Sequence, residues 1–241
     1  MTAAHRTALV SMLVAALLAA AGVAHAALGD VLEPYQARYE FSRSLLKADY
    51  DYSLAKDASS YTVSTVLEPR GIAAMAFEDA AREQARFVTE AGAIVPLSYS
   101  RDGGRSGNDG DAEVRFDWER GIADASTSGA TMEVPIARGE SFDLLTVELA
   151  ARRALASGIE QPEFSVVEGD EVVRYRYIPE GTATIEAGGR TWETVHYRLD
   201  RGSSREVHYW FAPDSDYLAI KVEQRARGKL KGTLTLQSLR P

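Results

Sequence analysis

Apolar and polar side chains alternate along most of the chain, and this pattern constrains the fold more than any other feature of the sequence. In residues 35–41, Tyr35, Ala37, Tyr39 and Phe41 alternate with polar residues, which places the aromatic side chains on one face of a β-strand. The same period of two recurs in segments separated by Gly, Pro and Asp turn residues. The expected strands are residues 35–41, 48–54, 61–67, 80–88, 94–101, 112–118, 121–126, 132–137, 163–167, 171–178, 182–187, 191–199, 205–211, 217–226 and 230–239.

This arrangement predicts a mainly β fold. Strands joined by short polar turns, at intervals of roughly ten residues in the second half of the chain, are typical of antiparallel meanders. We expect a single-domain antiparallel curved sheet or barrel-like meander, with a β-sandwich as the alternative architecture. Pro96 falls inside one expected strand, and proline cannot donate to a sheet ladder, so we predict an edge position or a bulge there.

One segment departs from the strand pattern, because its apolar residues are spaced by three and four. Leu145 and Leu149 follow this spacing within residues 141–155, which predicts one amphipathic helix. Ser141 or Asp143 is expected to cap its first N–H groups. A single amphipathic helix needs an apolar surface to cover, so we expect it to pack on one face or one open end of the sheet.

The N-terminal residues have the three-part organisation of a secretory signal peptide. His5 and Arg6 come first, an almost wholly apolar run follows, and Ala24–His25–Ala26 provides the small-x-small pattern that signal peptidases cut. We expect residues 1–26 to be a cleavable signal peptide and residues 27–241 to form a single β-rich domain in the bacterial periplasm. An uncleaved anchor is the alternative, but it needs about 20 strongly apolar residues, and this run is mainly alanine. No second long apolar run follows, so we expect no transmembrane span after signal cleavage.

The composition excludes several classes of function. The chain has no cysteine, which rules out disulfides, thiolate metal sites, iron–sulfur clusters and thiol nucleophiles. Its 35 Asp and Glu residues exceed its 27 Lys and Arg residues, which argues against a nucleic-acid partner because phosphate binding depends on clustered cations. The basic residues within 221–231 fall at odd positions, as on one solvated face of a hairpin.

Recognisable catalytic motifs are absent from the sequence. We find no nucleophile elbow, no H-E-x-x-H helix and no glycine loop that would cradle a phosphate. No catalytic residue and no cofactor are therefore predicted.

Two histidines, His196 and His208, follow the expected signal peptide. A turn at residues 201–203 predicts a hairpin in which they lie directly opposite each other. Such a pair could share a metal ion, but zinc needs a third protein ligand, and no carboxylate stands at a diagnostic spacing. We keep the two histidines as candidate metal ligands and predict no metal site.

The strongest remaining signal is aromatic. Tyrosine and tryptophan are concentrated on the expected strands, where most such side chains pack in cores. If the sheet curls without closing, the same side chains would line a cavity suited to a hydrophobic ligand. The candidate ligand-binding residues are Tyr39, Tyr50, Tyr52, Tyr197, Tyr209 and Trp210.

Residues 207–223, VHYWFAPDSDYLAIKVE, resemble a bacterial envelope family known as domain of unknown function 3108. The resemblance lies in the aromatic-Trp pair, the Ala-Pro-Asp turn and the following strand, and it extends from Tyr35 nearly to the C-terminus. Ala219 departs from the family pattern, which usually has proline there. The resemblance implies a secreted β-rich protein without an assigned activity. The Trp-x-Ala-Pro-Asp turn is also similar to hairpins in periplasmic lipoprotein carriers, an architectural analogy.

These observations rank three functions. The first is a periplasmic, non-enzymatic binding or carrier protein for a lipid-like or other hydrophobic ligand. The second is a structural or interaction protein of the cell envelope, with a filled interior and an envelope protein as its partner. An uncharacterised hydrolase ranks third.

Overall fold

The computed structural model describes residues 32–71, 74, 79–104, 110–127, 129–169 and 171–241. The expected signal peptide, residues 1–26, lies outside the described residues. No helix in the described ranges is long and apolar enough to cross a membrane.

The described strands form a single sheet whose order follows the chain in two runs. The first run goes from β1 to β8, and the second goes from β15 back to β9, with β1 and β15 paired at the junction. The strands of the first run are β1 (Tyr35–Arg43), β2 (Leu46–Asp57), β3 (Ser60–Arg70), β4 (Ala81–Glu90), β5 (Ala93–Asp102), β6 (Ala112–Asp117), β7 (Ile122–Thr127) and β8 (Ala130–Pro135). Those of the second run are β9 (Ser141–Phe142), β10 (Glu163–Glu168), β11 (Glu171–Ala187), β12 (Arg190–Asp200), β13 (Arg205–Ala212), β14 (Leu218–Ala226) and β15 (Lys229–Arg240).

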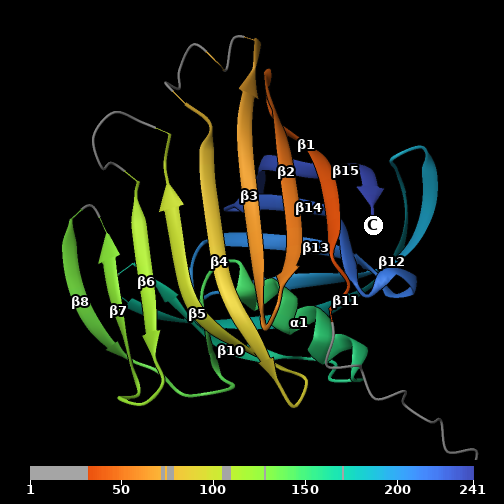
Figure 1. Ribbon diagram of the computed structural model, residues 1–241. Helices are drawn as coiled ribbons and strands as arrows, with labels where there is room; N and C mark the ends of the chain where they lie inside the picture. The colour runs from red at the N-terminus through yellow and green to blue at the C-terminus, as the bar shows by residue number, and fades with distance from the viewer. Residues whose placement is uncertain (1–31, 72–73, 75–78, 105–109, 128, 170) are drawn as a thin grey trace, which may run out of the picture.

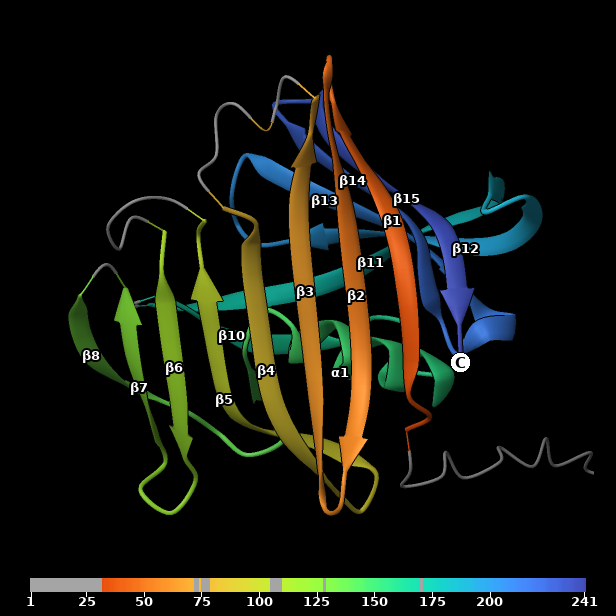
Figure 2. The same ribbon diagram turned by 45° about the horizontal axis from the view of Figure 1, so that its top comes forward.

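The sheet folds over on itself without closing. Its two halves cross at a steep angle, and the helix α1 (Thr146–Ala156) lies in the fold between them (Figures 1 and 2). Neighbouring strands are antiparallel except for the short β9, which pairs in parallel with β10. The mainly β prediction is therefore confirmed, with one helix and one continuous curved sheet in the described chain.

Bulges produce much of this curvature, because an extra residue on one strand bends it and increases its twist. Register shifts occur between Arg38 and Tyr39, between Trp210 and Phe211, and between Gln224 and Arg225. Another lies opposite Pro96, as expected from its missing N–H. The strands that meet at the junction are thus bent rather than flat.

Asp143 precedes the N-terminal end of α1, which faces the interior of the sheet. The fully buried Asp143 carboxylate accepts hydrogen bonds from the backbone N–H groups of Leu145 and Thr146, each at 2.9 Å, and from the Thr146 hydroxyl at 2.7 Å. Asp143 therefore accepts from the first backbone N–H groups of the helix, as expected, from a position three residues before Thr146. The helix itself begins at Thr146 rather than at residue 141, because Ser141 belongs to β9 and its hydroxyl accepts a hydrogen bond from Ala137 N–H.

Arg152 anchors α1 to both halves of the sheet. Its guanidinium donates to the Tyr35 hydroxyl at 2.5 Å and to the backbone carbonyl of Asp216 at 3.0 Å. Asp216 follows the Ala-Pro-Asp turn in a left-handed conformation, with a φ of 50°. The helix is thereby fixed against β1 and against the β13–β14 corner.

One predicted turn is part of a continuous strand in the structure. We expected a turn at residues 179–181, but β11 continues through them from Glu171 to Ala187. Pro179 pairs with Tyr197 and Gly181 pairs with His196, so Glu180 is an extra residue in a β-bulge. Gly181 permits the bulge because its φ of +120° is a conformation that other residues rarely adopt.

Candidate functional site

A partly open cavity of about 220 Å³ lies inside the folded sheet. Strands from both halves and the N-terminal part of α1 enclose it, so residues far apart in sequence meet there. It is lined by Tyr39, Tyr50, Tyr52, Glu83, Leu144, Leu145, Val147, Glu148, Tyr175, Leu199, Arg201, Val207, Tyr209, Ala219, Val222, Gln224 and Leu234. Its walls are therefore aromatic and aliphatic, with a few charged groups among them.

Four of the six predicted ligand-binding residues line this cavity. Tyr39 and Tyr52 are buried, and Tyr50 and Tyr209 are half-buried. Burial raises the pKa of all four phenols, so they are neutral at physiological pH. The Tyr39 hydroxyl donates to the Ala219 carbonyl at 2.9 Å and so joins β1 to β14 across the fold.

The other two predicted residues lie elsewhere. Tyr197 is buried but is not among the cavity-lining residues, and its ring packs against Phe211 with a centroid separation of 6.1 Å. Trp210 alternates with the cavity residue Tyr209 along β13, so its side chain lies on the opposite, outer face of the sheet.

Glu148 gives the cavity its distinctive electrostatics. It lies one turn before Arg152 on α1 and lines the cavity beside the tyrosines. Burial raises the pKa of its carboxyl, although the charge of Arg152 opposes this effect. Burial also raises the pKa of Glu83, on the opposing wall. The one cation of the lining, Arg201, forms an ion pair with Glu168, so its charge is already compensated.

Sequence reasoning missed Glu148, because a glutamate in an amphipathic helix ordinarily faces water. The only signal is a weak one, its place in the first turn of α1, one turn before Arg152. Only the folded position of the helix, inside the sheet, turns that side toward the tyrosines.

The histidine hairpin has a different register from the predicted one. His196 pairs with Trp210, and Arg198 pairs with His208, so the two histidines are not directly opposite. β12 ends at Asp200 and β13 begins at Arg205, and Asp200 accepts a hydrogen bond from Gly202 N–H in the loop between them. Relative to the predicted register, the partner of His196 moves by two residues, from His208 to Trp210, which keeps both histidines on the same face.

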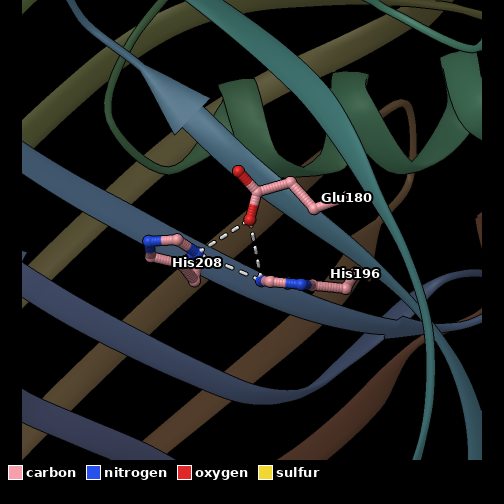
Figure 3. A group of neighbouring side chains, drawn as sticks. All are labelled: Glu180, His196 and His208. Atoms are coloured by element: carbon pink, nitrogen blue, oxygen red, sulfur yellow. Dashed lines mark hydrogen bonds and ion pairs between the residues drawn. The ribbon is translucent and has the colours of Figure 1, made fainter.

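The histidines nevertheless meet diagonally, and Glu180 joins them (Figure 3). His196 Nε2 lies 3.0 Å from His208 Nδ1, and Glu180 Oε2 lies 3.7 Å from the first nitrogen and 3.5 Å from the second. We call these three residues the Glu180–His196–His208 cluster. It lies on the outer face of β11, β12 and β13, so it is separated from the cavity by the sheet.

The sequence pattern does not single out Glu180, because Pro179-Glu180-Gly181 is typical of a turn. A regular β11 would alternate side chains through this point, whereas the bulge turns the extra carboxylate toward the histidines. The Pro179-Glu180-Gly181 triplet inside an otherwise alternating stretch was the signal for a bulge.

The fold defines a curved-sheet β protein with an internal, helix-flanked cavity. The family described as "Protein of unknown function (DUF3108)" matches residues 35–235, and the chain belongs to this family. The predicted family resemblance is thereby confirmed. A comparison with curated proteins finds no match.

Proposed function

We propose that this protein is an exported, non-enzymatic binding or carrier protein that holds a small lipid-like ligand in the cavity between its sheet halves. The observation that carries this proposal is the cavity itself, whose tyrosines and aliphatic side chains come from both halves of the sheet and from α1. Ligand pockets are typically concave and largely apolar, with a few placed polar groups.

The charged groups in the cavity support a neutral or cationic ligand. Glu83 and Glu148 face the space, with Arg101 and Arg152 as their cationic neighbours outside the lining, and the one lining cation, Arg201, is paired with Glu168. An anionic head group would raise the free energy of two partly desolvated carboxylates further. An ammonium group would instead relieve their desolvation and could contact tyrosine faces.

The proposed location is the periplasm. It rests on the signal-peptide pattern ending at Ala26. Mass spectrometry of protein recovered from the cell envelope should give a mature chain that begins at Ala27. A chain that retains its first 26 residues would contradict signal cleavage.

The ligand is tested by native mass spectrometry of protein purified from its own envelope, with organic extraction of bound molecules. We compare the wild type with Leu234→Trp, which fills the cavity, and with Thr235→Trp, its neighbour on the opposite face of β15. The wild type and Thr235→Trp should carry a co-purifying amphiphile. Leu234→Trp should lose most of it.

The head-group preference is tested with an alcohol, an amine and a carboxylic acid of one alkyl chain length. The amine and the alcohol should bind, and the carboxylic acid should bind most weakly. Glu148→Gln should weaken amine binding and leave alcohol binding nearly unchanged. The proposal would be contradicted if the wild type carried no co-purifying amphiphile and bound all three probes equally weakly. That result would favour an envelope protein that acts through a partner.

A further inference from the structure

The Glu180–His196–His208 cluster has the donor set of a metal site. Neutral imidazole nitrogen and carboxylate oxygen are ligands of zinc and related divalent ions, and two histidines with one glutamate leave a fourth position open. All three donor atoms lie within 4.8 Å of one another.

The spacing of the donors fits a tetrahedral ion. Zinc binds nitrogen and oxygen at about 2.0–2.1 Å, so adjacent ligand atoms of a tetrahedral site are about 3.3 Å apart. The three edges of the cluster measure 3.0, 3.5 and 3.7 Å. An ion placed near the centre of this triangle reaches all three donors with small side-chain adjustments.

Neighbouring groups hold the ligands in place. The His196 ring stacks on Trp210 with centroids 4.4 Å apart and an interplanar angle of 2°. Arg198 Nε donates to Glu180 Oε1 at 2.8 Å, which leaves Oε2 directed at the histidines. Metal ligands are commonly oriented by such outer contacts.

His208 supplies a separate argument. Its Nε2 is buried and has no hydrogen-bond partner, and the nearest carboxylate, Glu206 Oε2, lies 3.8 Å away. If Nδ1 binds a metal, Nε2 carries the proton and faces Glu206, the carboxylate–histidine arrangement typical of zinc sites. In the metal-free cluster, by contrast, a His–His hydrogen bond leaves Glu180 Oε2 without a donor from either ring, at 3.5 and 3.7 Å.

We propose that Glu180, His196 and His208 bind a divalent zinc-like ion on the outer face of β11–β13, with one coordination position open to solvent. This site lies on the opposite face of the sheet from the cavity and does not depend on the cavity being occupied. Arg198, Lys221 and Arg225 are the cations near it, and Glu206 and Glu223 are the additional acids.

The test is zinc binding by tag-free full-length protein, followed by isothermal titration calorimetry and by the visible absorption of bound Co²⁺. The wild type should bind one ion and give the intense absorption of tetrahedral Co²⁺. His196→Ala, His208→Ala and Glu180→Gln should each weaken binding by about 100-fold or more, and Glu206→Gln by about tenfold.

Glu186→Gln is the matched control, because Glu186 lies on the same strand and bonds to Thr191, away from the cluster. It should bind zinc like the wild type. Thermal unfolding in EDTA shows whether each variant is folded, and Glu180→Gln keeps the test valid if a histidine variant is not. Zinc binding that is absent, or that survives loss of both histidines, would overturn the proposal. Loss of zinc binding should leave the amphiphile content of the cavity unchanged, which separates this site from the proposed function.

Discussion

Glu148 is a carboxyl inside an aromatic cavity, and this position costs stability when the group is ionised. Its pKa is raised by burial, whereas in the unfolded chain glutamate titrates near pH 4.3, an approximate reference value. Between these two values the folded state holds the proton that the unfolded state has released, so the free energy of unfolding falls as pH rises.

We therefore expect the free energy of unfolding of Glu148→Gln, relative to that of the wild type, to be higher at pH 7 than at pH 3. The difference grows by about 1.4 kcal/mol for each pH unit between the unfolded and folded pKa values. Urea unfolding across this range measures it. The exposed control Glu186→Gln should show no such trend, and a Glu148→Gln effect that is independent of pH would refute the assignment.

Burial also raises the pKa of Asp143, but this carboxyl accepts hydrogen bonds that begin the helix, and those bonds oppose the shift. Asp143→Ala leaves two backbone N–H groups and the Thr146 hydroxyl without this acceptor. We expect a loss of about 2 kcal/mol or more in the free energy of unfolding. Asp143→Asn keeps an acceptor oxygen and should lose clearly less, as chemical unfolding would show; equal losses would mean that capping is not the cause.

Trp210 was predicted to contact a ligand, but its outer position gives it another role. It lies between His196 on β12 and Lys221 on β14, with Lys221 Nζ 4.6 Å from the ring centroid. Trp210→Ala should lower the free energy of unfolding by about 3 kcal/mol and weaken zinc binding. The amount of amphiphile extracted from the folded variant should be unchanged. Loss of the amphiphile would show that Trp210 contributes to ligand binding after all.

At the scale of elements, α1 depends on Arg152. The guanidinium donates to the Tyr35 hydroxyl and to the Asp216 carbonyl at once, so Arg152→Met leaves two partly buried acceptors without this donor. We expect a loss of about 2–4 kcal/mol. Arg152→Lys keeps the charge but not the planar guanidinium. Its stability should therefore lie between those of the wild type and Arg152→Met in a thermal unfolding series. If Arg152→Met loses no more stability than Arg152→Lys, the result would contradict the role of Arg152 in holding α1 against the sheet.

The strands were predictable because their alternation is local, and so was the cap, because Asp143 acts on residues only two and three positions away. Register was not predictable in the same way. The register of the histidine hairpin depends on how its loop closes, and the β11 bulge arises because Glu180 has no partner on β12 although Pro179 and Gly181 on either side are paired. The cavity depends on contacts such as Tyr39 with Ala219, which join distant parts of the chain through the folding of the whole sheet.

At the scale of the whole molecule, stability should vary across the sheet. β8 is an edge strand with mostly exposed side chains, whereas β1 is paired on both sides, with β2 and β15. Amide hydrogen exchange should therefore be fastest in β8 among the longer strands and slowest near the β1–β15 junction. Exchange of β1 at the rate of β8 would show that the junction opens independently of global unfolding.

The β1–β15 pairing also sets the order in which the sheet can be completed. Every other antiparallel pair joins strands that are consecutive in the chain, so these hairpins form from local contacts, while β1 must wait for β15. Until then one edge of β1, including Gln36 to Ser42, presents unpaired backbone groups. During synthesis and transport this edge is the point most exposed to pairing with another chain, so the nascent protein is most prone to aggregation immediately before β15 arrives.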